Sequence, residues 1–263
     1  MLSTFIALNL IGQKLNATSV KSKFPPTFVS KAFGRMGIKL TADEILSSYT
    51  ANKFYAVRRK GNKVFQVSYY ANTETFSLSN EQSGNSSEVG KKSREIELMS
   101  IAEKEFNGEL VTNFLSSEAI HHLKPIPRSE PPNSRITFGW QSVINGYKAG
   151  YEGDYVLLSF DRATGGLVSM EMKRNVVYSK PRIVITRGTA SGMAIKAIGK
   201  PGGDTNETNG ELRYHLFPDI ESRNIWKQTR KIRLKVGYYY GFNPHRACFV
   251  DAETGYLDVI SGK

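Results

Sequence analysis

Few residues of this sequence have the type and spacing for metal chemistry, and a histidine pair comes first among them. Glu118 precedes His121 by three residues, a spacing that puts both side chains on one face of a helix and that some metal sites use. His122 must point elsewhere, because adjacent side chains diverge on a helix or a strand. The sequence has no second Glu-x-x-His and no His-x-x-x-His. We therefore favour polar residues at a helix end over a metal site.

The single cysteine, Cys248, excludes an intramolecular disulfide framework and any zinc site built from several cysteines. His245 lies three residues before it, which suggests a thiol nucleophile, but the surrounding apolar run favours a buried and inert thiol. The glycine-rich stretch 199–204 lacks the Gly-Lys-Ser/Thr ending of a phosphate-binding loop. We assign no catalytic, cofactor-binding or metal residue and no cofactor, and predict that the protein is not an enzyme.

Three aspartates are candidate catalytic acids or bases, but a repeated turn motif accounts better for the presence of two of them. Asp161 and Asp251 occupy the same position of a motif, apolar-Asp-x-x-Thr-Gly-x-Leu, that occurs twice at a distance of 90 residues. Such a segment predicts a tight hairpin turn, because Asp can accept hydrogen bonds from backbone amides two or three residues on and Gly adopts a positive φ. The third, Asp154, lies outside this motif.

The net charge of +12 suggests an anionic partner, and it is concentrated at the two ends of the chain. Residues 1–92 carry 13 basic and 5 acidic side chains, residues 93–180 carry 10 and 11, and residues 181–263 carry 13 and 8. In the stretch 231–236 the charges alternate with apolar residues, which favours solvated strand faces over an anion-facing patch. The aromatic run 238–240 is either a binding surface beside Arg233 and Lys235 or a cover for one sheet face.

The elements around the two turns also repeat. Alternating apolar residues flank each turn, so each is predicted to be strand–turn–strand. A helix is predicted before each pair, over residues 93–108 with Ser93 as N-cap and over residues 189–199 with a stripe that includes Ala194 and Ala197. A degenerate third copy comes first: a capping box opens a helix at Thr41, strands follow at 54–59 and 64–70, and Asn72 stands in place of the aspartate.

This arrangement resembles the PepSY-like superfamily, in particular the YcdB/YcdC-type repeats of exported bacterial proteins. The residues that carry the resemblance are Trp140, Ile144-Asn145-Gly146, Gly153-Asp154, the turn at 161–168 and the closing stretch 249–257. It implies an α+β fold of tandem PepSY-like units, each a helix packed on a small antiparallel β-sheet. The segments are then an N-terminal or signal segment at 1–22, a degenerate unit at 23–90, and PepSY-like units at 91–180 and 181–263.

The first residues bear on localisation. The apolar run at 4–11 and the small residue Ala17 fit a secretory signal, although no basic residue precedes the run; an amphipathic helix capped by Ser3 is the alternative. We predict a secreted or periplasmic, envelope-associated protein. No run reaches the roughly 20 apolar residues of a transmembrane helix.

The function predicted from these features is a non-enzymatic, exported PepSY-like interaction module. Its expected partner is a peptidase, which it restrains or chaperones, or a component of the cell envelope. The alternative is a basic nucleic-acid-binding protein, whose salt-dependent binding would need Arg230, Lys231 and Arg233. An enzyme is the third hypothesis, and no motif supports it.

Overall fold

A computed structural model of the chain describes residues 20–82, 94–126, 134–174, 176–198, 210–218, 223, 232–243 and 246–261. The chain forms two compact units that interleave along the sequence. Unit 1 contains Met1–His121, Pro125–Trp140 and Tyr155–Arg174, and unit 2 contains His122–Lys124, Gln141–Asp154 and Asn175–Lys263.

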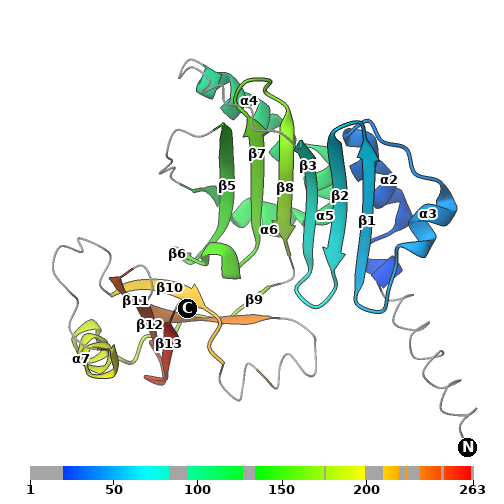
Figure 1. Cartoon of the computed structure of the whole chain (residues 1–263). Coiled ribbons are helices and arrows are strands. Elements are labelled where there is room, and N and C mark those ends of the chain that lie inside the picture. The colour runs from blue at the N-terminus through cyan, green and yellow to red at the C-terminus, as the bar shows by residue number, and fades with distance from the viewer. Residues whose placement is uncertain are drawn as a thin grey trace, which may run out of the picture. The chain divides into compact units, whose positions relative to one another are not determined.

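Unit 1 is an antiparallel sheet with helices on one face (Figure 1). Its strands, in hydrogen-bonded order, are β1 (Lys53–Lys60), β2 (Lys63–Tyr70), β3 (Thr75–Gln82), β8 (Leu167–Lys173), β7 (Tyr155–Asp161) and the first part of β5 (Arg135–Ile144). Its helices are α2 (Pro26–Arg35), α3 (Ala42–Ser47), α4 (Arg94–Phe106) and α5 (Glu109–Phe114). The chain passes between the units through α6 (Ser117–His122) and β4 (Leu123–Pro125).

The core of unit 1 is built from one face of its strands. Residues paired across antiparallel strands share a face, and the register joins Ala56 to Val67, Val67 to Leu78 and Leu78 to Met170. All four are buried. Aromatic rings fill the space between this face and the helices, and they touch in pairs: Phe24, Phe28, Phe54, Tyr69, Phe76 and Phe114.

Unit 2 is a smaller sheet with helix α7 against it (Figure 1). Its elements are β6 (Tyr147–Lys148), the short 3-10 helix η1 (Gly150–Glu152), β9 (Val177–Tyr178), α7 (Arg187–Ile198), β10 (Glu211–His215), β11 (Arg233–Asn243), β12 (Arg246–Asp251) and β13 (Leu257–Ser261). The pairings of β10 with β6 and of β11 with β9 are parallel, and the others are antiparallel. The sheet is therefore mixed.

The predicted fold class, tandem PepSY-like units each with its own small antiparallel sheet, is wrong. Among the described residues, 13 strands are hydrogen-bonded in a mixed arrangement: 11 follow one order, and β4 and β9 pair with β5 and β11 beside it. Strand β3 of the predicted 23–90 unit pairs with β8 of the predicted 91–180 unit, from Thr75 opposite Lys173 to Ser79 opposite Ser169. An exposed strand edge offers unpaired amides and carbonyls, and here two predicted units satisfy each other's edges instead of closing separately.

Several local predictions are confirmed. The capping box at Thr41 is present, with the Thr41 side chain accepting from the Glu44 amide and the Glu44 carboxylate accepting from the Thr41 amide. The predicted 93–108 helix appears as α4, followed by Gly108, while Ser93 lies outside the described residues. The second predicted helix appears as α7, but its buried stripe is Ala190 and Ala194, and Ala197 is exposed. None of the described helices is long and apolar enough to cross a bilayer.

Candidate functional site

The residues singled out for metal chemistry do not assemble a metal site. His121 and His122 end helix α6, as the helix-end interpretation predicts. Within the described part of the chain, no three His, Cys, Asp or Glu side chains come together to hold an ion. The stretch 199–204 and His245 lie outside the described residues.

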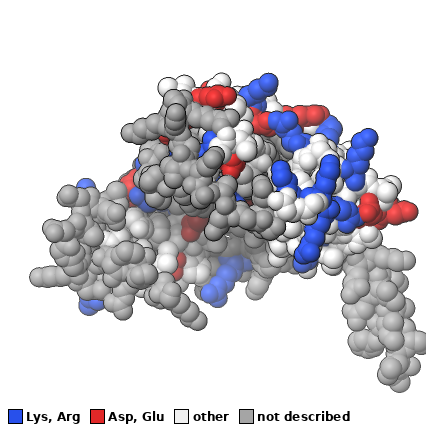
Figure 2. All heavy atoms as spheres, turned by 45° about the horizontal axis from the view of Figure 1, so that its top comes forward, with Lys and Arg blue, Asp and Glu red and all other residues white. Residues whose placement is uncertain are grey.

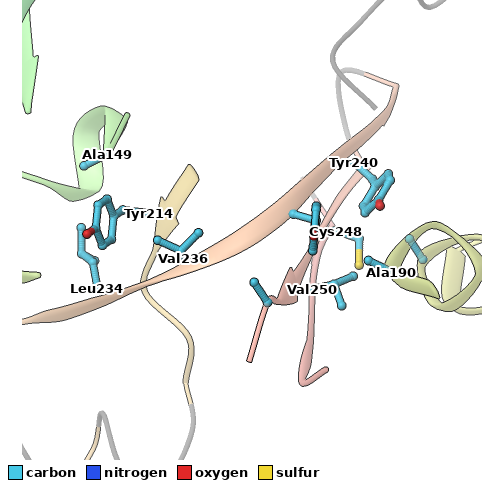
Figure 3. Packing of buried hydrophobic residues seen from close by; sticks show 11 residues of the cluster. Ala149, Ala190, Tyr214, Leu234, Val236, Tyr240, Cys248 and Val250 are labelled. Carbon is cyan, nitrogen blue, oxygen red and sulfur yellow. The ribbon is translucent and has the colours of Figure 1, made fainter. Parts of the chain in front are cut away.

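Cys248 is buried in the apolar core of unit 2, as predicted. Its thiol lies beside Ala190 of α7 in a cluster that also contains Val250 and Tyr240 (Figure 3). Burial, with a smaller contribution from the charge of Asp258, raises the pKa of the thiol to about 11. A thiol with so high a pKa is protonated at neutral pH and is a poor nucleophile.

The two Asp-x-x-Thr-Gly motifs form the predicted turns. The Asp161 carboxylate accepts from the Thr164 amide at 2.7 Å, and Gly165 has φ +74°. The Asp251 carboxylate accepts from the amides of Glu253 and Thr254 at 2.8 and 3.1 Å. Both aspartates therefore stabilise their turns by accepting hydrogen bonds from backbone amides.

The turn of the degenerate first copy has a different alignment from the predicted one. Glu74, with φ +50°, occupies the position of Gly165, so Tyr70 rather than Asn72 stands where Asp161 does. Glu74 is therefore a non-glycine residue in a left-handed turn position, a conformation that costs on the order of 1 kcal/mol.

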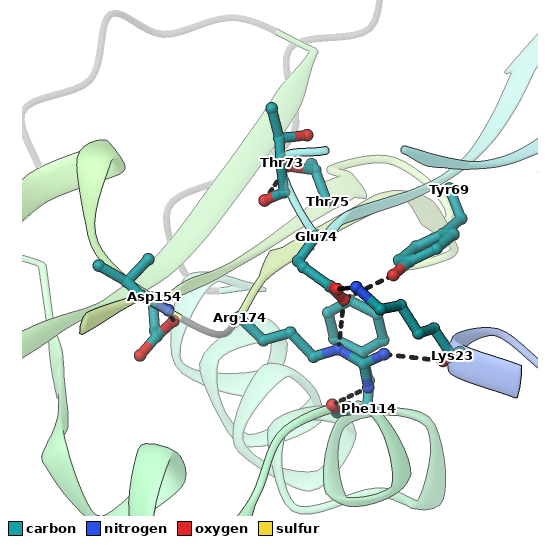
Figure 4. Close-up of polar contacts among 9 residues, drawn as sticks. Lys23, Tyr69, Thr73, Glu74, Thr75, Phe114, Asp154 and Arg174 are labelled. Carbon is teal, nitrogen blue, oxygen red and sulfur yellow. Dashed lines mark hydrogen bonds and ion pairs between the residues drawn. The ribbon is translucent and has the colours of Figure 1, made fainter. Parts of the chain in front are cut away.

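Glu74 is the centre of a buried charged cluster that sequence reasoning missed (Figure 4). Its carboxylate accepts from Lys23 Nζ at 2.5 Å, from the Tyr69 hydroxyl at 2.5 Å and from Arg174 Nε at 3.2 Å. The Arg174 guanidinium also donates to the backbone carbonyls of Phe114 and Lys23, each at 2.7 Å. These contacts tie four distant segments of unit 1 together. The only sequence signal is that Thr73-Glu74 aligns with Thr164-Gly165.

The contacts around Glu74 determine its ionisation. Burial of the carboxyl raises its pKa, but hydrogen bonds from Lys23 and Tyr69 and the charges of Arg174 and Lys23 outweigh burial. The pKa therefore lies below its ordinary value, and Glu74 is ionised at neutral pH. A small hollow of about 140 Å³ lies beside the cluster, and the cations that line it all face carboxylates: Lys23 and Arg174 face Glu74, and Lys31 pairs with Glu109.

The basic surface over the first helices and strands of unit 1 is similarly mixed. Figure 2 shows Lys and Arg side chains on this part of the molecule with Asp and Glu among them. Arg58 pairs with Glu44, and Arg35 pairs with Glu105. Carboxylates on the same surface thus neutralise part of the excess positive charge of residues 1–92.

Strand β11 separates its side chains into two sets. Tyr238 and Tyr240 face the apolar core, where their hydroxyls donate to the carbonyls of Ile185 and Arg187 at 2.9 and 3.0 Å. Tyr239 lies on the opposite face, with the Arg213 guanidinium 4.5 Å from its ring centre. The aromatic run thus mainly builds the core.

The predicted solvated face of β11 is wrong at Lys235. This residue is only 7% exposed, and its backbone pairs with His215 of β10. Its neighbour on the same face, Arg233, is half-buried and donates from Nε to the Ser179 hydroxyl at 2.6 Å. Alternation along a strand indicates which face a residue takes, but not whether that face is covered.

Lys235 and Arg233 belong to a hollow of about 260 Å³ in unit 2. Its charged lining consists of four cations and two carboxylates: Lys180, Arg182, Arg233, Lys235, Asp251 and Glu253. We call this hollow the basic hollow. Arg182 pairs with Glu253 at 2.9 Å, and Lys235 Nζ lies 3.8 Å from Asp251 Oδ2.

The walls of the basic hollow are fixed by backbone hydrogen bonds. The Ser179 amide donates to the Leu234 carbonyl at 2.9 Å, which holds one wall along β11. The Ala252 amide donates to the Val236 carbonyl at 3.1 Å, which holds the second Asp-x-x-Thr-Gly turn against the same strand. The site is therefore built on paired strands and a turn.

Asp251 has an unusual environment for a turn residue. Its side chain is 1% exposed, and Oδ1 makes the turn hydrogen bonds. Oδ2 is buried and accepts no hydrogen bond from the described residues, and Lys235 Nζ lies 3.8 Å from it. A buried carboxylate oxygen without a donor is costly unless a charge compensates it, so Asp251 and Lys235 depend on each other.

A second polar group of unit 2 centres on His215. Its ring stacks on Phe249 with centroids 3.7 Å apart, Nε2 lies 2.6 Å from Asp258 Oδ2, and Nδ1 lies 2.9 Å from Glu152 Oε2. Asp154, the third of the predicted candidate acids, is occupied elsewhere in unit 2: it is buried and accepts from the Val176 amide and the Tyr178 hydroxyl. Asp154 and Asp251 are thus each engaged in separate structural contacts.

Comparison with known proteins gives no family for this chain. No family model matches it, and no curated protein matches it. Among solved structures, an uncharacterized protein from Eubacterium rectale aligns with 88% of this chain and 80% of its own at 10% sequence identity and a TM-score of 0.36.

Proposed function

We propose that this protein is a non-catalytic binding protein whose ligand is an anion held in the basic hollow of unit 2. The observation that supports the proposal is the burial of Lys235 in a concave site lined by two more cations than carboxylates. Burying a lysine is expensive unless a negative charge compensates it, and Asp251 is 3.8 Å away. An anion in the hollow would lie among the four cations that line it.

The state of the available nucleophile supports binding over catalysis. The Cys248 thiol is protonated at neutral pH and packed in the apolar core, on the opposite face of the sheet from Lys235. The cations of the hollow are anchored on fixed walls, as electrostatic recognition requires.

Binding of a simple anion tests the proposal. Thermal unfolding is followed in millimolar inorganic phosphate and in sodium chloride of equal ionic strength. A ligand that binds only the folded state raises the melting temperature, so phosphate should raise it and chloride should not. The rise should disappear in Lys180→Met and persist in Lys31→Met, which removes one cation from the hollow of unit 1. Equal melting temperatures in phosphate and chloride would contradict the proposal.

Export to the cell envelope is the second part of the proposal and rests on the sequence of residues 1–17, outside the described residues. Sequencing the N-terminus of the protein made by its own cells tests it. A mature chain that starts after Ala17 would support export, and a chain that retains Met1 in the cytosol would contradict it. A peptidase or envelope partner, taken from the resemblance, stays a prediction.

A further inference from the structure

We infer that the basic hollow selects hydrogenphosphate, an oxyanion that keeps a proton of its own, over a fully ionised oxyanion of the same shape such as sulfate. This inference rests on the proposed function and specifies its ligand. Asp251 carries it, because this residue lines the hollow and one oxygen of its buried carboxylate has no hydrogen-bond donor among the described residues.

The turn fixes the orientation of the Asp251 carboxylate. Its Oδ1 accepts from the amides of Glu253 and Thr254 at 2.8 and 3.1 Å. The turn is itself held on β11, because the Ala252 amide donates to the Val236 carbonyl at 3.1 Å. The two carboxylate oxygens cannot exchange places without breaking both turn bonds. Oδ2 is therefore an acceptor with a fixed position.

Oδ2 of Asp251 needs a donor that the described residues do not supply. The side chain is 1% exposed, and Lys235 Nζ lies 3.8 Å from Oδ2, beyond the roughly 3.2 Å of an N–H···O hydrogen bond. Leaving a buried acceptor without a donor costs free energy. A ligand that donates to Oδ2 recovers this cost, whereas a ligand that presents only lone pairs is repelled by the carboxylate.

The hollow places both signs of charge side by side, so the donor and the negative charge of its ligand must also lie close together. Arg182 lies 2.9 Å from Glu253, and Lys235 lies 3.8 Å from Asp251. Hydrogenphosphate carries one O–H donor and its anionic oxygens on a single phosphorus atom. Sulfate has the same tetrahedral shape and the same double charge, but no proton at neutral pH.

The strength and the size of the contact both favour hydrogenphosphate. A hydrogen bond from a hydroxyl to a carboxylate is charge-assisted and about twice as strong as one between neutral groups. The hollow of about 260 Å³ corresponds to roughly nine water molecules at about 30 Å³ each, so a tetrahedral oxyanion fits together with several waters.

Paired ligands test the inference. Isothermal titration calorimetry of the full chain at pH 8 compares phosphate with sulfate, and glycolate with acetate, at equal ionic strength. We expect phosphate to bind about tenfold or more tightly than sulfate, because only phosphate donates to Oδ2. Sulfate that binds as tightly as phosphate would show that water alone serves Oδ2, which overturns the inference and leaves the proposed function standing.

The other two ligands extend the same test. Glycolate carries its donor on a hydroxyl beside a carboxylate, and we expect it to bind more weakly than phosphate. Tighter binding of glycolate would overturn the inference in favour of a hydroxy acid. Binding of none of the four anions would overturn both the inference and the proposed function.

A substitution in each motif turn assigns the selectivity to Asp251. In Asp251→Asn the side-chain oxygen must keep the turn bonds, because backbone amides only donate, so the NH2 group takes the place of Oδ2. This group donates to an anion, and we expect sulfate to bind at least as tightly as phosphate. Asp161→Asn makes the same change in the turn of unit 1 and should keep the preference of the natural chain.

The remaining outcomes also decide the inference. A preference for phosphate that persists in Asp251→Asn, or disappears in Asp161→Asn, would overturn it. If Asp251→Asn does not fold, Lys180→Met removes a cation from the hollow and leaves Asp251 in place. It should weaken phosphate and sulfate by the same factor, and a loss of their ratio would place the selectivity outside Asp251.

Discussion

The buried charges of the two units are balanced in opposite ways. In unit 1, one carboxylate, Glu74, receives hydrogen bonds from three side chains, Lys23, Tyr69 and Arg174. In unit 2, Lys235 and Asp251 face each other at 3.8 Å, and Asp251 Oδ2 accepts no hydrogen bond from the described residues. Both oxygens of Glu74 thus have donors, whereas one oxygen of Asp251 has none among the described residues.

This difference separates a structural cluster from a candidate binding site. Both hollows are lined by basic residues, so the residue types of the linings alone do not distinguish them. Every cation that lines the hollow of unit 1 pairs with a carboxylate outside that lining, whereas the lining of the basic hollow itself contains two carboxylates, each near one cation. Buried charges stabilise a fold only when paired and hydrogen-bonded, and an excess of one sign is a feature typical of a site for the opposite sign.

Among the substitutions that test this comparison of the two units, removal of the Glu74 charge should have the largest effect on stability. Glu74→Gln keeps the shape of the side chain but leaves Lys23 and Arg174 without their carboxylate, so we expect a loss of about 3 kcal/mol in the free energy of unfolding. Urea unfolding measures it. Glu109→Gln breaks the exposed pair with Lys31 and should cost less than about 1 kcal/mol. Equal losses would show that the Glu74 cluster is no more than a surface pair.

The two motif turns give a matched pair of substitutions. Asp251→Asn keeps the Oδ1 acceptor of the turn but removes the charge opposite Lys235, and we expect it to cost about 2 kcal/mol. Asp161→Asn makes the same change where the aspartate is partly exposed, and it should cost less than about 0.5 kcal/mol. Urea unfolding of both variants checks the difference, and similar losses would mean that Asp251 acts only as a turn residue.

Acid should weaken unit 1 through Glu74. Its pKa in the folded protein is lowered relative to the ordinary value of 4.5. Its contribution to stability is therefore present above that value and is lost as the pH falls through the folded pKa. The loss of unfolding free energy between pH 7 and pH 3 should be smaller in Glu74→Gln than in the natural chain. An equal loss of unfolding free energy in Glu74→Gln and in the natural chain would mean that groups other than Glu74 cause the acid sensitivity.

The smallest expected effect concerns the core of unit 2. Tyr240→Phe removes the hydroxyl that donates to the Arg187 carbonyl at 3.0 Å and keeps the ring. We expect a loss of about 1 kcal/mol, because the carbonyl at the start of α7 loses one donor. Phosphate should still raise the melting temperature, since Tyr240 faces away from the basic hollow. Loss of the phosphate response would mean that core and hollow are coupled.

Local structure was largely predictable because it depends on neighbours in sequence. The two turns with Asp161 and Asp251 formed as predicted, since the carboxylate reaches amides two or three residues away. The capping box joins Thr41 to Glu44, three positions later, and also formed. The buried thiol of Cys248 followed from its apolar surroundings.

Pairings between distant segments were not predictable in the same way. Nothing in the local sequence distinguishes a strand edge that closes its own unit from one that pairs with another, so the β3–β8 pairing overturned the tandem units. Glu74 looked like a departure from a turn motif, and only the approach of Lys23 and Arg174, 51 and 100 residues away, made it the centre of a cluster.

The sequence by itself determined the two motif turns at Asp161 and Asp251, the capping box at Thr41 and the absence of a cysteine framework, because these depend on residue type and short-range geometry. The tertiary structure decided which strands share a sheet and which charges are buried. Lys235 shows the reason: its alternation with apolar neighbours predicts its face, but not that the folded chain leaves it only 7% exposed. Burial is a property of what packs around a strand, and packing is set by segments far away in the chain.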